Sequence, residues 1–442
     1  MLDIKFIRDH KEELKKAISN KGIDLDVDEL LKMDDKRREL LGKVEELNSL
    51  KNDINELVKE AKSEEERKEV IEKGKEIKDK LAKDEPQYET IKRMFDLLMV
   101  KVPTIPSPDT PVGKSEKDNA EISRWGEIPK FGFAAKDHIQ LGKELDILDL
   151  ERGVKVAGYR GYYVKNEGVT LVMGLMMYAL GKMIEKGYAP VIPPTLVKEF
   201  ALFGSGYFKG KEYDLNTDEI YQVATSDKEA TGEASKDKKF LVGTAEPSLL
   251  AYYAGDILEE KNLPLKICGF SQCYRSEIGS YGKDTKGIYR VHEFMKVEQV
   301  VLCPADIAQS EKVQQEMISI SREMYEELGL PYRQVQVCTG EMGAGKYKMF
   351  DLEVWIPSRN AYGEGGSASN FLDWQARRLK VKYVDKEGNK RYAYMLNNTA
   401  LASPRIFIAI LENFQQADGS VKVPEVLKKY MPVAADVIKK KV

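Results

Sequence analysis

Cysteine and histidine are scarce in this chain, and their scarcity excludes two kinds of structure. The 442 residues include 4 cysteines and 3 histidines. The cysteines lie far apart, at Cys268, Cys273, Cys303 and Cys338, and form no CxxC pair. Such spacing supports neither a disulfide framework nor a four-ligand zinc site. We therefore expect a protein of the reducing cytosol, without zinc, whose cysteines are small buried apolar residues.

Long hydrophobic runs and a positive charge balance are also lacking. No stretch of about 18 consecutive apolar residues occurs, so no membrane span or membrane partner is expected. Residues 1–16 are charged and helical in pattern, without the apolar core of a signal peptide. The formal net charge is −3, so RNA could be bound only by local basic patches and not by a generally basic surface. These features predict a cytoplasmic protein.

Residues 28–100 carry a helical repeat of their own. Apolar residues recur at alternating steps of three and four, with charges between them, over 40–61 and again over 70–98. This spacing is typical of a coiled coil. Ser63 followed by Glu66 forms a capping box that starts a second helix, so we predict an antiparallel hairpin with its tip near Ser63. The expected seam consists of Leu40, Val44, Leu47, Leu50, Ile54, Leu57, Ala61, Val70, Ile77, Leu81, Tyr88, Ile91, Phe95 and Leu98.

Two features of this hairpin stay open at the level of sequence. Pro86 lies in the returning helix, where it predicts a kink or break, and Asp84 could cap a restart. The hairpin could serve as a dimerisation or spacer coil, which is a common use of the pattern. It could instead be an arm that reaches a distant part of a long substrate.

The second part of the chain has a mixed pattern. A Pro-rich connector at 101–118 disfavours both helix and strand. Beyond it, apolar helices such as 170–186 and β-rich runs such as 347–355 follow without regular βαβ alternation. The pattern predicts an α+β domain on an antiparallel β-sheet flanked by helices.

The predicted organisation has three parts. A helical domain occupies 1–100, a linker 101–118 and the α+β domain 119–442. Within the last, residues 224–239 are small and polar and predict a mobile loop or insertion.

Nucleotide binding, if present, must depend on arginines. No Walker loop and no GxGxxG motif occurs, so a glycine cradle for phosphates is excluded. Three clusters, of which the first and the third contain arginine, together supply arginine, acidic and small polar residues. They are residues 273–277 with the loop 278–290, 291–294 and Glu298; residues 351–355 with 362–370; and residues 396–405 with the apolar helix that follows.

These clusters resemble motifs 2 and 3 of class II aminoacyl-tRNA synthetases, and 187–194 (GYAPVIPP) resembles motif 1. Among class II enzymes, the chain is most similar to the seryl-tRNA synthetase family, which also has a long N-terminal coiled-coil arm. The resemblance therefore covers nearly the whole chain. The runs that carry it are TAE at 244–246, TGEMG at 339–343, DLEVW at 351–355, SASNFLDWQARR at 367–378 and ILENFQQADGSVKVPEVLKKYM at 410–431.

The resemblance implies a substrate set and an assembly. It implies activation of L-serine by ATP, with release of pyrophosphate, and transfer of serine to the 3′-terminal adenosine of tRNA(Ser), with tRNA(Sec) a second candidate. It also implies tRNA binding by the coiled-coil arm and the motif 2 loop, and a homodimer through the motif 1 region. Two rival interpretations are a ligase that charges another carrier and a non-catalytic RNA-binding paralogue. The arm argues against the first, and the retained arginines and acids against the second.

The resemblance also assigns two catalytic arginines. Arg275 would bridge the α-phosphate and the serine carboxylate, and Arg405 would meet the γ-phosphate. Since both reactants are anions, positioning and charge neutralisation matter most, and a planar guanidinium can bind both groups bidentately. Glu364 and Ser367 would hold Mg²⁺, which prefers oxygen ligands. The implied ATP-binding positions are Arg275, Ser276, Glu277, Val291, His292, Glu293, Phe294, Glu364, Gly365, Gly366, Ser367 and Arg405.

Serine is small, so its recognition must depend on polar groups that an alanine substrate would leave unpaired. We expect Glu298 and Thr399 to contact the hydroxyl group and Glu246 to lie near the ammonium group. The serine-binding positions that the resemblance implies are Thr244, Ala245, Glu246, Arg275, Glu298, Asn397 and Thr399.

Several residues have a plainer alternative. His292 is either an adenosine-side residue or a packed edge residue, and Glu353 is a structural acid. In the motif 2 loop, Tyr281, Lys283 and Lys286 either approach the acceptor end of tRNA or are solvated turn residues. The chain departs from the family at Gly363, where arginine is frequent, and at Gly365, Gly366, Ala368, Asn398, Thr399 and Pro404.

Overall fold

A computed structural model describes residues 2–208, 210, 213–215, 217–224, 228, 231–233, 237–278, 286–431 and 436–440. The chain divides into two compact units, Leu2–Pro103 and Thr104–Val442.

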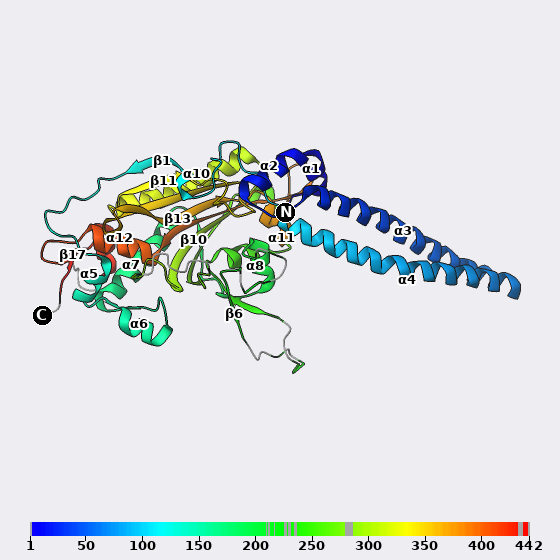
Figure 1. The fold of residues 1–442 in the computed structure, drawn as a ribbon, viewed down its shortest axis with the longest axis horizontal. Coiled ribbons are helices and arrows are strands. Elements are labelled where there is room, and N and C mark those ends of the chain that lie inside the picture. The colour runs from blue at the N-terminus through cyan, green and yellow to red at the C-terminus, as the bar shows by residue number, and fades with distance from the viewer. Residues whose placement is uncertain are drawn as a thin grey trace. The chain divides into compact units, whose positions relative to one another are not determined.

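The first unit consists of four helices, and its last two form the expected hairpin (Figure 1). Asp26 begins the long helix of the outgoing arm by accepting hydrogen bonds from the backbone N–H groups of Asp28 and Glu29. Ser63 caps the returning helix by accepting from the Glu66 N–H at 3.1 Å, as the capping box predicts. The helices are α1 (Ile4–Asp9), α2 (Lys11–Lys21), α3 (Val27–Glu60) and α4 (Glu64–Lys101).

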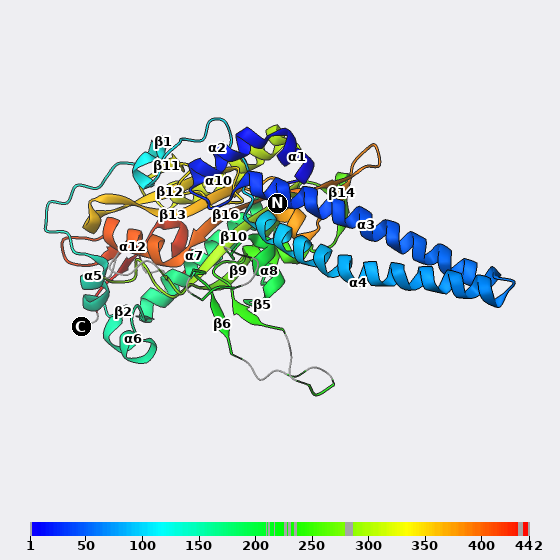
Figure 2. The same ribbon diagram turned by 45° about the vertical axis from the view of Figure 1, so that its right-hand side comes forward.

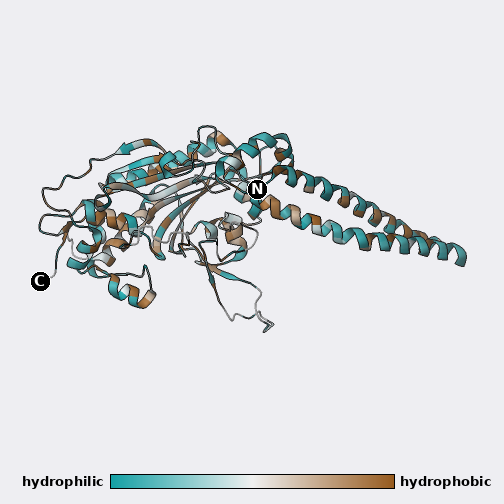
Figure 3. Cartoon of the chain, viewed as in Figure 1, coloured by the Kyte–Doolittle hydropathy of each residue, from teal (hydrophilic) through white to brown (hydrophobic). Residues whose placement is uncertain are grey.

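The hairpin is packed more tightly at its base than near its tip. Leu40 of α3 and Leu81, Ile91 and Phe95 of α4 are buried. Two expected seam residues nearer the tip, Leu50 and Leu57, are instead 42% and 51% exposed. Two helices bury only one narrow stripe each, so a residue at the margin of the stripe stays in contact with water. The distal part is accordingly mostly hydrophilic in Figure 3.

The break expected at Pro86 is wrong, because α4 is continuous from Glu64 to Lys101. Proline removes one helical N–H donor and disturbs one turn. Leu81 and Ile91, on either side of that turn, are buried, and the Thr90 hydroxyl donates to the Pro86 carbonyl at 2.8 Å. Packing on both sides outweighs the local cost.

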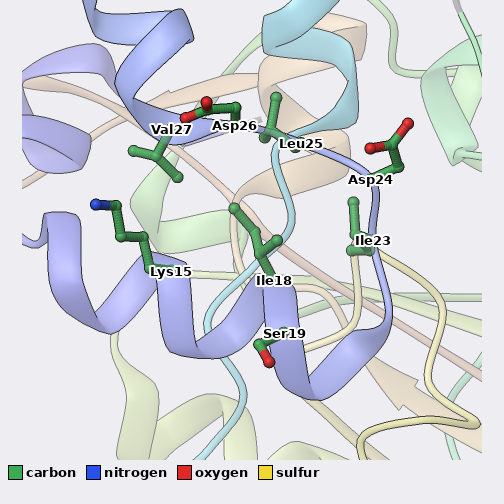
Figure 4. A pocket seen from close by; sticks show the side chains of 8 residues that line it. All are labelled: Lys15, Ile18, Ser19, Ile23, Asp24, Leu25, Asp26 and Val27. Atoms are coloured by element: carbon green, nitrogen blue, oxygen red, sulfur yellow. The ribbon is translucent and has the colours of Figure 1, made fainter.

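A shallow pocket lies between α2 and the segment that leads into α3 (Figure 4). Lys15 at its edge pairs with Asp28 at 2.7 Å, and Asp26 in its wall caps α3. We attribute this pocket to the capping turn. Its lining residues are Lys15, Ile18, Ser19, Ile23, Asp24, Leu25, Asp26 and Val27.

The second unit is built on an eight-stranded sheet with the order β1-β11-β12-β13-β16-β10-β9-β4 (Figure 2). Neighbouring strands are antiparallel, as expected, except that β4 pairs with β9 in parallel. The strands are β1 (Ala120–Trp125), β4 (Ala189–Val191), β9 (Leu265–Tyr274), β10 (Glu293–Cys303), β11 (Tyr332–Gln336), β12 (Lys348–Ile356), β13 (Ala361–Asn370) and β16 (Tyr394–Ala402).

Side chains of the central strands alternate between the two faces of this sheet. Gln299 of β10 and Asn398 of β16 face the helix α10 (Ile307–Glu327), where both bond to Ser321. The helices α7 (Asn166–Glu185) and α12 (Ser403–Asn413) contribute to the same large core as α10. The short helices α9 (Glu246–Ala251) and α11 (Trp374–Leu379) pack in a second core with β10 and β16. Polar residues of β10 and β16 that alternate with Gln299 and Asn398 therefore face away from α10.

Helix α7 has the length and the apolar composition of a membrane span, alone among the helices of the described residues. Its side chains Leu171, Leu175 and Met183 are fully buried in the large core. Core packing accounts for its hydrophobicity.

Shorter elements complete the second unit. Residues 102–115 have neither helix nor strand. The polar segment 224–239 connects β6 to β7, which pair antiparallel, and much of it lies outside the described residues. The remaining elements are α5 (His138–Glu144), β2 (Leu148–Asp149), α6 (Leu150–Ala157), β3 (Tyr163–Val164), β5 (Leu196–Lys198), α8 (Glu199–Ser205), β6 (Tyr221–Val223), β7 (Lys239–Leu241), β8 (Ile257–Glu259), β14 (Lys382–Val384), β15 (Lys390–Tyr392), β17 (Val421–Lys422), β18 (Val437–Ile438) and the 3₁₀ turns η1 (Glu116–Asp118), η2 (Glu260–Asn262), η3 (Pro357–Arg359) and η4 (Glu425–Tyr430).

A buried carboxylate in the helical unit gives a test of its packing. The Asp34 side chain is 1% exposed and accepts from Arg8 and Arg37, each at 2.7 Å. Because Asp34→Asn removes the buried counter-charge of both guanidinium groups and leaves Arg8 with only the exposed Asp35, we expect a loss of about 2 kcal/mol in unfolding free energy. Urea unfolding followed by helical circular dichroism measures it. Asp35→Asn is the matched control, because Asp35 is 63% exposed. Equal effects of the two substitutions would contradict the packing described here.

Candidate active site

One cavity collects residues from all three arginine clusters. It lies where the ends of β9 and β10 meet β13, β16 and the start of α12, and together with the solvent at its mouth it measures about 530 Å³. Nine residues that the sequence analysis singled out lie in its wall. The full lining is Arg275, Glu277, Tyr289, Arg290, Val291, Phe294, Lys296, Glu364, Gly365, Gly366, Thr399, Ala402, Pro404 and Arg405.

Arg275 directly follows β9 and is held from two sides. Its Nε donates to the Gly243 carbonyl at 3.3 Å, and its guanidinium lies 5.4 Å from the centre of the Phe294 ring. His292 fixes the backbone at this point, because its Nδ1 lies 2.8 Å from the Arg275 carbonyl. His292 therefore supports Arg275 and is not itself part of the cavity wall.

Arg405 lies in the first turn of α12 and faces Glu364 of β13. Its Nη1 donates to the Glu364 carbonyl at 2.7 Å and to the carboxylate at 3.2 Å. Desolvation by the cavity walls works against ionisation of Glu364, but Arg405 and Arg275 outweigh it and lower the pKa of that carboxyl. The guanidinium also lies 4.5 Å from the centre of the Tyr289 ring. Arg275 and Arg405 are thus fixed in the cavity wall together with the ionised Glu364.

Glu277 is a second acid in the wall of the cavity. It has a backbone φ of +55°, which is uncommon for a residue with a side chain and is held only where the surroundings require it. Its carboxylate accepts from Arg290 at 2.8 Å, and Arg160 lies 3.9 Å away. Two arginines therefore fix this acid beside the apolar wall of Val291 and Phe294.

Glu246 is the centre of a buried polar network beside the cavity. Its Oε1 accepts from Gln375 and Asn397, each at 2.7 Å, and its Oε2 accepts from the Tyr207 hydroxyl at 3.1 Å. Burial raises the pKa of Glu246 to about 7, and the negative charge of Glu298 adds to the effect. A cation bound here would restore the ionised form.

Glu298 and Thr399, which we expect to contact the serine hydroxyl, lie close together and share a partner that was not foreseen. The Thr399 hydroxyl lies 3.4 Å from the Glu298 carboxylate, and Lys296 lies 2.6 Å from the same oxygen. Lys296 is buried and lines the cavity. Its position two residues before Glu298 on one strand places both on one face, which is a signal that the sequence analysis did not use.

Other predicted positions lie at the margin of the cavity. Thr244 and Ala245 are buried directly before α9, and Glu293 is exposed and accepts from Gln272 at 2.8 Å. The Oγ atoms of Thr244 and Ser276 are buried without a hydrogen-bond partner among the described residues. In the motif 2 loop Lys286 is exposed, whereas Tyr281 and Lys283 lie outside the described residues.

The oxygen donors near Glu364 fit a magnesium ion. Ser367 pairs across the strands with Asp351 of β12, and the Oδ1 of Asp351 is buried without a partner among the described residues. Burial and the charge of Glu364 raise the pKa of Asp351 well above its usual value. A carboxylate, a hydroxyl group and an orphaned carboxyl oxygen form a donor set that suits Mg²⁺. Glu353, by contrast, pairs with Arg333 at 2.5 Å and is structural, as expected.

The glycines that depart from the family pattern leave room for bulky neighbours. A Cβ at Gly363 would overlap the Tyr289 hydroxyl, and one at Gly365 would overlap the Tyr325 hydroxyl. A Cβ at Gly366 would lie 2.9 Å from the Thr399 Cβ. At each of these three glycines, a neighbouring side chain therefore occupies the space that a larger residue would need.

Comparison with known proteins explains this arrangement. The model of the seryl-tRNA synthetase N-terminal domain matches residues 1–106, and that of the class II tRNA synthetase core domain (G, H, P, S and T) matches residues 226–414. Serine–tRNA ligase of Borreliella afzelii is 41% identical over 434 residues, which is 97% of this chain and 98% of that protein. The chain belongs to the seryl-tRNA synthetase family.

Solved structures agree with this membership. The crystal structure of seryl-tRNA synthetase from Pyrococcus horikoshii complexed with ATP has a TM-score of 0.88 and 36% identity, and covers 100% of both chains. The cytoplasmic serine–tRNA ligase from Naegleria fowleri in complex with AMP has a TM-score of 0.83 and 30% identity, and the match covers 100% of this chain and 99% of that one. The predicted family and fold class are both confirmed.

The raised pKa of Glu246 predicts a pH effect on stability. This pKa is about 7 in the folded chain against an ordinary value of 4.5. Between these values the folded chain holds more protons here than the unfolded chain, so stability is lost as the pH rises through this window. Glu246→Gln cannot titrate, and we expect the wild type to lose on the order of 3 kcal/mol relative to it.

Urea unfolding at about pH 4.5 and about pH 8 measures this difference. Fluorescence of Trp125, Trp355 and Trp374 reports only on the second unit, which holds all 3 tryptophans. Constant effects of the amide cancel, since only the change with pH is compared. Parallel pH curves for the two proteins would show that Glu246 has an ordinary pKa.

Proposed function

We propose that this chain is an ATP-dependent serine–tRNA ligase that forms seryl-adenylate and then transfers serine to the 3′-terminal adenosine of tRNA(Ser). The observation that carries the proposal is one cavity in which Arg275 and Arg405 flank Glu364, directly beside the polar network of Glu246, Glu298 and Thr399. Membership in the seryl-tRNA synthetase family supports the same conclusion.

Adenylation needs two anions to be brought together. A carboxylate oxygen of serine attacks the α-phosphorus of ATP, the new P–O bond forms, and pyrophosphate leaves. Arg275 would bind both the attacking carboxylate and the α-phosphate, and Arg405 the γ-phosphate, so that repulsion is offset and the reacting atoms are aligned. Glu364 and Ser367, with Asp351 beside them, would hold Mg²⁺, which when bound neutralises phosphate charge.

The adenosine of ATP would occupy the wall between Glu277 and Phe294. Glu277 is fixed by Arg290 and can accept a hydrogen bond from a base, while Phe294 offers a ring face beside Arg275. Val291, Gly365 and Gly366 would complete the wall of the proposed ATP site, with Ser276, His292 and Glu293 at its margin.

The serine pocket would use charge and hydroxyl recognition. The ammonium group of serine would bind beside Glu246. The pKa of this carboxyl is about 7, and a bound cation would lower that pKa and so favour the carboxylate. Glu298 and Thr399 would bond to the β-hydroxyl, which an alanine substrate lacks. Thr244, Ala245 and Asn397 complete the pocket. Its polar groups are carboxylates, amides and hydroxyls, so we propose recognition without zinc.

In the second step, each unit would contact a different part of the tRNA. The hairpin of α3 and α4 would bind the body of tRNA(Ser), and the motif 2 loop, with Lys286 exposed at its end, would approach the acceptor end. We further propose a cytosolic homodimer through the motif 1 region, where Ile192 is 82% exposed. A subunit contact there would remove this apolar side chain from water.

Shortening the hairpin tests the division of labour. Gly74 lies against Ile54, so removal of residues 51–77, with a short Gly-Ser turn in their place, cuts both helices at matching heights. We expect serine-dependent exchange of pyrophosphate into ATP to stay within about twofold, because the cavity is untouched. Transfer to tRNA(Ser) should fall by about 100-fold or more, through KM for tRNA.

Exchange and transfer are measured on the same preparation. Absence of serine-dependent exchange in the full-length protein would overturn the ligase proposal, in favour of a non-catalytic paralogue. Exchange without transfer to tRNA would favour a ligase for another carrier. Equal loss of both activities in the shortened protein would contradict the role of the hairpin.

A further inference from the structure

His138, at the start of α5, is bound through one edge of its ring to a buried acid. The backbone N–H of His138 donates to Oε1 of Glu412 at 2.9 Å, and the ring Nδ1 lies 2.8 Å from the same oxygen. Ser358 donates to Glu412 through its N–H and its hydroxyl group, each at 2.9 Å. The Glu412 side chain is fully buried in α12. Three segments distant in sequence are thus joined at one carboxylate.

The other edge of the ring faces the loop that enters β10. The N–H of Ile288 points at the His138 Nε2, with 3.3 Å between the nitrogens. Gly287, next to it, has a φ of +67°, and a Cβ there would overlap the same ring nitrogen. The backbone of Gly287 and Ile288 therefore lies directly on the histidine ring, and Ile288 is 1% exposed.

These partners determine the protonation of the ring. Burial works against ionisation of Glu412, but the hydrogen bonds from His138 and Ser358 lower its pKa, so this carboxylate only accepts. The Ile288 N–H only donates. One form of the ring satisfies both, with a proton on Nδ1 and a lone pair on Nε2. The ring thus links α12 to the loop before β10.

Both ends of this link lead to the proposed ATP site. Glu412 lies seven residues, or about two turns, after Arg405 on α12. Ile288 directly precedes Tyr289, Arg290 and Val291, which line the cavity. The Tyr289 carbonyl accepts from the Arg405 Nε at 3.3 Å.

We propose that His138 is a positioning residue for ATP: it holds the 289–291 wall at a fixed distance from the helix that carries Arg405. It touches no substrate and acts through the Ile288 N–H. The inference rests on the ligase function proposed above. It predicts a selective effect on ATP, since Glu246, Glu298 and Thr399 bond to other residues and no hydrogen bond of the described residues joins them to Ile288.

Two substitutions separate this role from a purely structural one. In His138→Asn, the amide nitrogen takes the place of Nδ1 and donates to Glu412, but nothing reaches Ile288. In His138→Gln, the longer side chain brings a carbonyl oxygen to the place of Nε2 and leaves Glu412 without its ring donor. His10→Asn is the matched control, because His10 is 40% exposed in the helical unit.

The assay is pyrophosphate exchange with ATP and serine varied separately, together with thermal unfolding and amide hydrogen exchange of peptides that cover 286–292. For His138→Asn we expect KM for ATP to rise about tenfold, which corresponds to one lost hydrogen bond. KM for serine should stay within about twofold, and the Ile288 amide should exchange faster. His138→Gln should unfold at a lower temperature than His138→Asn, because it loses the donor to Glu412. Its KM for ATP should nevertheless rise less, because it keeps an acceptor for the Ile288 N–H.

The outcomes distinguish the two proposals. If both variants raise KM for ATP and for serine alike, in step with lost thermal stability, His138 is structural and the inference is overturned. Unchanged KM for ATP in His138→Asn, with faster exchange at Ile288, also overturns it. Absence of serine-dependent exchange in the wild type would instead refute the ligase function itself.

Discussion

Charge compensation within one cavity is the constraint on which the second unit depends. Arg275, Arg405 and Lys296 lie among Glu364, Glu298 and Glu277, and each acid is fixed by at least one cation. A cationic group in a partly dry cavity is costly unless an anion lies near it. A bound polyanion can replace the protein acids as the partner of the arginines. A bound divalent cation can replace the protein cations as the partner of the acids. In the absence of ligands, these ion pairs thus hold in place the side chains that the substrates would bind.

The sheet makes this cavity possible because its central strands differ on their two faces. On the face toward α10, Gln299 and Asn398 bond to the helix, and the apolar core closes over them. On the other face, Lys296, Glu298, Asn397 and Thr399 lie together at the cavity. The core supplies stability on one side and the polar face supplies chemistry on the other. His138 and Glu412 extend the arrangement by tying the loop before β10 to α12.

Local sequence was sufficient for the hairpin tip and for the residues of the arginine clusters. Ser63 and Glu66 form a cap within four residues, and the strand pattern around Glu298 has a period of two, so both can be inferred from neighbours in the chain. Leu50, Leu57 and Pro86 were misjudged because their environment depends on how far the partner helix covers them. Asp351 and His138 were missed for a similar reason, since the residues that they meet lie on other elements and no short motif contains both members of such a pair. Lys296 was missed although its partner Glu298 lies only two residues after it on the same strand.

The account is tested most directly by a crystal structure of the protein with serine, Mg²⁺ and a non-hydrolysable ATP analogue. It predicts that the guanidinium groups of Arg275 and Arg405 both lie within hydrogen-bond distance of phosphate oxygens, with Glu364 released from Arg405 toward the metal. It also predicts the serine hydroxyl between Glu298 and Thr399. A triphosphate bound elsewhere, with neither arginine in contact with it, would contradict the central claim.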